Sequence, residues 1–198
     1  PFLSEGKNNL IEGFGKDYGT YFSILSCIAR GKNTRSEIED VIGREVGGYL
    51  TNLENEYELI AKRQPLFEKS ATKNVRYELG DVFYSFWFRF VFKYSYIIEI
   101  ENYGKLQQII ERDYNTFSGL MLERYFHRVA MESGEFTRIG RWWDRKGENE
   151  IDMIAEDELS DHAVFYEIKR QKDEISIGTL KQKAEAMLRA TGAFKNYE

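Results

Sequence analysis

The chain has 198 residues (23.3 kDa), 42% hydrophobic and 31% charged, which suits one large or two small globular domains and excludes an intrinsically disordered protein. Its net charge of −5, from 28 basic and 33 acidic residues, excludes a uniformly basic nucleic-acid-binding protein and leaves any DNA contact to a local patch. Its one cysteine, Cys27, excludes an internal disulfide and a thiolate metal cluster, and with no signal peptide in view we expect a cytoplasmic protein.

The N-terminal part of the chain predicts three helices followed by a two-stranded hairpin. Apolar residues at helical spacing in the first helix end at Gly31, and Thr34–Glu37 has the pattern of a capping box that starts the second. The first predicted helix is Tyr21–Arg30, and the second follows the capping box and stops at Gly43. The third carries Val46, Tyr49, Leu50, Leu53 and Tyr57 on one face, and the predicted strands are residues 59–63 and 75–79. This order is typical of a winged helix-turn-helix, which we assign to residues 17–80.

Residues 82–98 are apolar on nearly all sides, and their alternating phenylalanines also suit a strand. Arg89 and Lys93 interrupt the segment, which is short for a membrane span, so we expect no membrane association. Asp81 can cap the start of a helix, which favours a buried aromatic helix. We therefore assign residues 81–115 to linker helices.

The C-terminal part predicts a helix, three strands and a second helix, which makes the whole chain a mixed α+β protein. The predicted elements are a helix from Leu106 to about Ser133, strands Phe136–Arg145, Glu150–Ala155 and Ala163–Lys169, and a helix over Ile175–Ala190. Trp142 and Trp143 are adjacent on a strand, so we expect one to pack inward and the other outward, with base stacking as an alternative role.

Two of these strands carry charged residues among apolar ones. Glu167 and Lys169 share a strand face, and Asp152 lies between apolar neighbours on the preceding strand. Burying such groups is costly unless they pair with each other or bind a metal. Metal-assisted phosphodiester hydrolysis requires this set: Asp152 and Glu167 would hold Mg²⁺ or Mn²⁺, and Lys169 would position water or phosphate. An ion pair at a strand end is the alternative explanation.

Asp152, fourteen intervening residues and then Glu167-Ile168-Lys169 resemble the PD-(D/E)XK superfamily of restriction-endonuclease-like nucleases. The resemblance implies that residues 116–198 form such an α/β domain, with Asp152, Glu167 and Lys169 as catalytic residues. It also implies that Glu123, on the preceding helix, joins Asp152 and Glu167 as a metal ligand. The sequence departs from the pattern at Ile151, which stands in place of the proline.

A wider resemblance covers most of the chain. Arg76–Phe90, and Trp142-Trp143 leading to Glu150-Ile151-Asp152, are similar to the C-terminal half of prokaryotic, archaeal-type AAA ATPases. In those proteins a P-loop ATPase is followed by a winged helix and a nuclease-like domain. The resemblance implies an ATPase module as partner, with residues 1–16 as the end of its lid or a linker. No P-loop motif occurs in this chain, so we expect no nucleotide-binding site.

Arg44, at the start of the third predicted helix, is nearly the only positive charge there, against Glu45, Glu54, Glu56 and Glu58. We therefore expect that this helix does not bind strongly in the major groove of DNA. The hairpin and its loop are better placed to contact phosphates, with a solvated surface as an equal alternative. The candidate DNA-binding residues are Arg44, Lys62, Arg63, Lys69, Lys73 and Arg76. His127 and His162 lack partners at ligand spacing, so we expect no zinc site.

A restriction-endonuclease-like core needs a fourth strand after its second helix, and the tail beyond Gly192 is too short and polar to form one. We expect an unpaired sheet edge that another molecule covers, which could make a homo-oligomer, or a natural chain that continues past Glu198. Two functions remain open: a Mg²⁺-dependent nuclease joined to a DNA-binding winged helix, or a catalytically inactive nuclease-fold module that binds DNA or a partner protein and regulates the ATPase. The second would be favoured if isothermal titration shows no binding of Mg²⁺ or Mn²⁺ and Asp152 and Glu167 face Lys169 or arginines instead.

Overall fold

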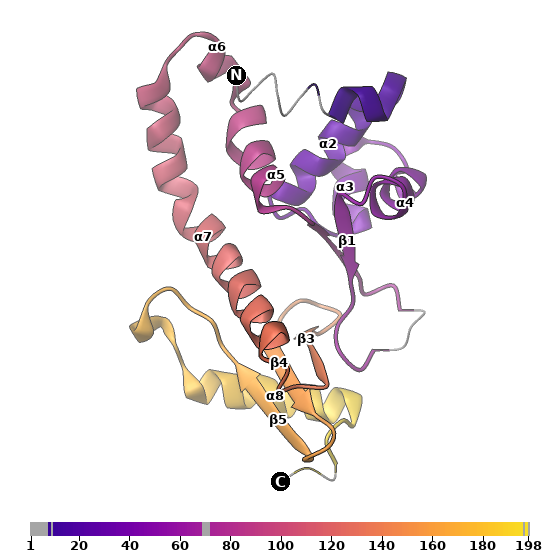
Figure 1. Ribbon diagram of the computed structural model, residues 1–198, viewed down its shortest axis with the longest axis vertical. Helices are drawn as coiled ribbons and strands as arrows, with labels where there is room; N and C mark the ends of the chain where they lie inside the picture. Colours follow the sequence, from indigo (N-terminus) through magenta and orange to yellow (C-terminus); the bar gives the residue numbers. More distant parts are fainter. Residues whose placement is uncertain (1–7, 9, 69–71, 196, 198) are drawn as a thin grey trace. The chain divides into compact units, whose positions relative to one another are not determined.

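The computed structural model describes residues 8, 10–68, 72–195 and 197, which fall into two compact units (Figure 1). The first unit contains the described residues up to Arg63 together with Val75–Tyr114. The second contains those of Gln64–Asn74 and all described residues from Asn115 onward. Each unit combines helices with a small antiparallel sheet, so the fold is mixed α+β, as predicted.

In the first unit, three helices precede an antiparallel hairpin, in the predicted order. These elements are α2 (Tyr18–Ala29), α3 (Arg35–Ile42), α4 (Gly47–Asn55), β1 (Ile60–Arg63) and β2 (Arg76–Leu79), with a 3₁₀ turn, η1 (Gly15–Asp17), before α2. The hairpin pairs Ile60 with Leu79 and Arg63 with Arg76. The capping box before α3 is confirmed, because the Glu37 amide donates to Thr34 Oγ1 and the Thr34 amide donates to Glu37 Oε2.

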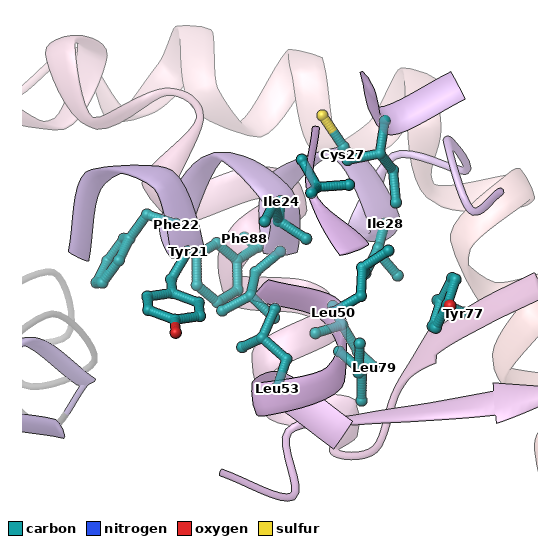
Figure 2. Close-up of a cluster of buried hydrophobic side chains, with 14 of the residues drawn as sticks. Tyr21, Phe22, Ile24, Cys27, Ile28, Leu50, Leu53, Tyr77, Leu79 and Phe88 are labelled. Atoms are coloured by element: carbon teal, nitrogen blue, oxygen red, sulfur yellow. The ribbon is translucent and has the colours of Figure 1, made fainter. Parts of the chain in front are cut away.

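A buried apolar cluster joins these helices to the hairpin (Figure 2). Ile24 and Leu25 of α2 are fully buried, and Leu50 and Leu53 of α4 are nearly so. Each such side chain contributes about 1.5–3 kcal/mol when it leaves water. The core follows from the helical spacing of apolar residues in the two helices.

The aromatic segment is helical, so the expected helix is confirmed and the alternative strand is excluded. It comprises α5 (Val82–Phe86), the π-helix η2 (Trp87–Phe92) and α6 (Ser95–Glu99). The Asp81 carboxylate caps α5 by accepting a hydrogen bond of 2.6 Å from the Phe83 amide. Trp87 and Phe88 are buried against Phe22 of α2.

None of the helices in the described part of the chain is both long and apolar enough to cross a membrane.

Helix α7 (Tyr103–Ser133) leads into the second unit, where three strands and a last helix follow it as predicted. These are β3 (Arg138–Trp143), β4 (Glu150–Asp157), β5 (His162–Tyr166) and α8 (Ile177–Thr191), with a 3₁₀ turn, η3 (Lys172–Glu174), before α8. The sheet is antiparallel in the order β3-β4-β5 (Figure 1). Among the described residues no further strand pairs with the outer edge of β5.

The core of the second unit lies between the sheet and α8. Trp142, Ile151, Ile154 and Met187 are its buried residues, and apolar side chains from the loop between β1 and β2 pack against it. The expectation that one tryptophan would face outward is wrong, since Trp142 and Trp143 are each only 3% exposed. Trp143 is covered because its indole N–H donates to Asn74 Oδ1 of that loop, at 2.8 Å.

Candidate functional site

A β-bulge in β4 lies at the centre of the site. Gly140 of β3 pairs with Ile154 and Trp142 pairs with Ile151, so the single residue Arg141 faces both Asp152 and Met153. A bulge interrupts the ladder of hydrogen bonds and re-aims the side chains at that position. Both Arg141 and Asp152 therefore have backbone oxygens that bond outside the β3–β4 ladder.

The bulge places Asp152 at the end of β5. His127 Nε2 of α7 lies 2.9 Å from the Asp152 backbone oxygen. The Asp152 carboxylate oxygen Oδ2 accepts hydrogen bonds from the Ile168 amide, at 2.8 Å, and from Lys169 Nζ, at 3.0 Å. Because the Ile168 amide bonds to this side chain, β5 ends at Tyr166, and the predicted strand over Ala163–Lys169 is three residues too long.

Glu167 lies just beyond the strand, and its side chain is only 7% exposed. Its oxygen Oε2 accepts a hydrogen bond of 3.1 Å from the Ser176 amide, at the start of α8. Its oxygen Oε1 lies 3.5 Å from Lys183 Nζ and 3.9 Å from Lys169 Nζ. Two lysines therefore compensate the charge of this carboxylate.

Lys169 bridges the two carboxylates. Burial lowers its pKa, but the hydrogen bond and charge of Asp152, together with Glu167 and Glu123, raise the pKa of Lys169 above its ordinary value. The ammonium group therefore stays protonated at neutral pH, where it forms the centre of the charge cluster.

Glu123 is half-buried on α7, as predicted, and forms an ion pair with Arg141 at 3.2 Å. Burial, which Asp152 and Glu150 reinforce and Arg141 and Lys169 oppose, raises the pKa of Glu123 to about 7. Glu123 therefore changes charge close to neutral pH.

A cleft of about 360 Å³ opens beside this cluster. Gly119 and Glu123 of α7 form part of its lining, and Lys169 and Arg170 line it from the segment after β5. At the cleft, the Arg170 guanidinium donates a hydrogen bond to Asn115 Oδ1. The cleft gives small polar groups access to Lys169 and Glu123.

In this arrangement each of the predicted metal ligands has a basic partner. Asp152 pairs with Lys169, Glu167 lies between two lysines, and Glu123 pairs with Arg141. Across the part of the chain that the structure describes, no three or more His, Cys, Asp or Glu side chains are grouped to hold a metal ion. Two lysines and an arginine therefore lie beside the carboxylates that would have to bind a divalent cation.

Among the described candidate DNA-binding residues, Lys62, Arg63 and Arg76 lie on the hairpin of the first unit. Arg63 and Arg76 face each other across the hairpin, where Lys62 is exposed and Arg63 pairs with Glu78 at 3.3 Å. Arg44 bonds to the Tyr49 hydroxyl at 2.9 Å. Lys73 is exposed in the second unit, and Lys69 lies outside the described residues.

Sequence reasoning missed His127, Arg141 and Lys183 as members of the charge cluster. His127 is four residues after Glu123 on α7, so helical spacing could have revealed it. Lys183 is three residues after the inward-facing Leu180 of α8, which is a weaker signal. Arg141 lies opposite the bulge, and the pattern of apolar residues in the sequence does not predict a bulge at this position.

Comparison with known proteins places the chain among uncharacterized relatives. The sequence model of the family DUF234, described as "Archaea bacterial proteins of unknown function", matches residues 87–187. The chain is 36% identical over 160 residues to the uncharacterized protein MJECL04 of Methanocaldococcus jannaschii, an alignment that covers 76% of this chain and 35% of the relative. The chain thus corresponds to about a third of the length of this curated relative. No solved structure matches the chain.

Proposed function

The chain belongs to the DUF234 family of archaeal and bacterial proteins, and we propose that it is the C-terminal region of an AAA-type ATPase, where it acts as a non-catalytic regulatory module. In this proposal the first unit is a winged helix, and the second is a restriction-endonuclease-like fold whose acidic site is neutralised by lysines. The module docks onto a partner protein, the ATPase module of the parent chain.

The pairing of Asp152 and Glu167 with lysines carries the proposal. Removing the partner of a buried charge is strongly destabilising, so Lys169 and Lys183 stabilise the carboxylates in this arrangement. A catalytic metal would have to compete with Lys169 for Asp152. The cluster is therefore suited to hold β4, β5 and α8 together.

The order of elements supports the placement within a larger protein. Three helices and a hairpin, then aromatic helices, then a helix, three strands and a helix follow one another as the resemblance to archaeal-type AAA ATPases implies. The matched relative is longer than this chain, as such a placement requires.

A protein partner is favoured over DNA by the distribution of charge. Arg44 and Arg35 lie beside the start of α4, where Arg35 pairs with Glu39, and Glu45, Glu54 and Glu56 place negative charge along that helix. On the hairpin, Arg63 pairs with Glu78 at 3.3 Å, which compensates part of its positive charge. A phosphate-binding surface needs basic side chains gathered on one face.

A metal-dependent nuclease is the second candidate function. It is favoured by the convergence of Asp152, Glu167 and Lys169 beside an open cleft, because this set is the one that the nuclease resemblance implies. The two candidates make opposite predictions about DNA cleavage.

Incubation with plasmid and single-stranded DNA in Mg²⁺ or Mn²⁺ tests the proposal directly. We expect no cleavage by the wild-type protein above that of Lys169→Ala, with the exposed Lys181→Ala as a matched control. Adding the chain to the ATPase portion of its parent should change the rate of ATP hydrolysis. Cleavage by the wild type and Lys181→Ala that is lost in Lys169→Ala and Asp152→Asn would establish the nuclease instead.

A further inference from the structure

The loop between β1 and β2, Gln64–Asn74, belongs to the second unit although both of its strands belong to the first. The chain therefore passes between the units at each end of this loop, as well as once within α7. A winged helix uses such a loop to contact DNA phosphates, so the contacts of its described residues decide whether it is available for that role.

The backbone of the loop bonds to the bulge of the candidate site. The Leu66 amide donates a hydrogen bond of 2.8 Å to the backbone oxygen of Arg141, the residue that faces the bulge. The Leu66 side chain covers Gly140, where a Cβ atom would lie only 2.6 Å from Leu66 Cγ. The close approach of loop and strand therefore requires glycine at position 140.

Phe67 packs beside Leu66. Its ring meets Phe194 edge-on with centroids 5.0 Å apart, and the Arg138 guanidinium lies 5.5 Å from its centre. Its φ of 67° is in the left-handed region, which costs a non-glycine residue about 1–2 kcal/mol. The surrounding contacts must outweigh this cost, which indicates that packing determines the conformation of the loop.

Asn74 anchors the far end of the loop. Its amide oxygen accepts from the Trp143 indole N–H at 2.8 Å, and its amide nitrogen donates to the Trp143 backbone oxygen at 3.4 Å. Pro65 is buried at the near end. The described residues of the loop are thus held at both ends against β3.

We propose that the described residues of this loop, 64–68 and 72–74, form a docking segment that positions Arg141 on Glu123 at the candidate site. The bond from Leu66 fixes the Arg141 backbone on one side of β3, and the Arg141 guanidinium reaches Glu123 at 3.2 Å. Leu66 and Arg141 are positioning residues. The docking itself is independent of the proposed function, whereas its influence on a regulatory or catalytic role of the site rests on that function.

The guanidinium signals of Arg141 in NMR spectra test the positioning. In the wild type we expect a distinct side-chain Nε–H signal that exchanges slowly with water. In Leu66→Ala the exchange should be at least about tenfold faster, because local opening of the loop releases the strand. Leu66→Met, which restores most of the apolar contact, should restore slow exchange.

Leu180→Ala is the matched control, because Leu180 packs against the same core from α8 without contacting Arg141 through the loop. It should lower stability and leave the Arg141 signal unchanged. An unchanged signal in a folded Leu66→Ala protein, or equal loss in Leu180→Ala, would overturn the proposal.

Amide hydrogen exchange of the wild type makes the test independent of how well any variant folds. The Leu66 amide should be protected to the same degree as the amides of β3, and rapid exchange of that amide would also overturn the proposal. Neither measurement depends on DNA cleavage, so a failure of the proposed function would be distinguishable from a failure of the docking.

Discussion

Glu123 is the side chain of the charge cluster whose ionisation responds to pH near neutrality. Because burial raises its pKa from 4.5 to about 7, the folded protein favours the protonated form. The stability that this gives is fully present below pH 4.5 and is lost as the pH rises through about 7. Burial is the largest cause of this shift, which Arg141 reduces and Asp152 increases.

Replacing Glu123 with glutamine should remove this pH dependence. Relative to the wild type, the free energy of unfolding of Glu123→Gln should rise by roughly 2 kcal/mol between acidic and mildly alkaline pH. Urea denaturation across that pH range measures the difference. The exposed Glu135→Gln serves as control, and wild-type and Glu123→Gln curves that run parallel would contradict the burial of Glu123.

Lys183 should stabilise the protein through Glu167, which is too deeply buried for water to replace the lost partner. We expect Lys183→Met to lower the free energy of unfolding by about 1–3 kcal/mol. Lys181→Met, on the exposed side of the same helix, should change it by less than about 0.5 kcal/mol. Equal effects in chemical denaturation would show that Glu167 does not depend on Lys183.

Within the elements of the second unit, replacing each of two glycines with alanine should change the stability in opposite directions. Gly140→Ala forces Leu66 away from β3 and should destabilise the unit by about 1–3 kcal/mol. Gly119, inside α7, has open space where its Cβ would be, so Gly119→Ala should stabilise by about 0.5–1 kcal/mol. Thermal and urea denaturation check both signs, and a neutral Gly140→Ala would contradict the close contact with the loop.

Local signals in the sequence predicted most of the elements. The capping box of α3, the Asp81 cap of α5 and the left-handed glycines Gly31, Gly134 and Gly192 all act within a few residues of the helix end that they define. The helix–three strands–helix order of the second unit follows from hydrophobic periodicity in the same way. These features need no knowledge of distant residues.

Distant contacts decided what the sequence did not predict. The β5 strand ends at Tyr166, and the Ile168 amide that follows it donates a hydrogen bond to the Asp152 carboxylate. Trp143 is buried on the side where its indole N–H donates to Asn74 of the loop. The charge cluster likewise needed Arg141 at the bulge and Lys183 from α8 to complete the pairing. The sequence pattern identified Asp152, Glu167 and Lys169, but it did not identify Arg141 and Lys183, the basic side chains that pair with Glu123 and Glu167.

For the whole molecule, the central claim is that lysines rather than a metal balance the acidic site. The chain has a net charge of −5, so weak attraction of cations to the protein does not by itself show a specific metal site. A specific site must be recognised by its dependence on Asp152. Lys169 is the residue whose removal separates the two explanations, because it contacts both carboxylates.

Binding of Mn²⁺, followed by the electron paramagnetic resonance signal of the free ion, is the most direct measurement. We predict that the wild-type protein and the Lys181→Met control leave the signal unchanged. In Lys169→Met the uncompensated carboxylates should bind the ion, and adding Asp152→Asn to that variant should abolish the binding. Binding of Mn²⁺ by the wild type that Asp152→Asn removes would contradict the lysine-neutralised site.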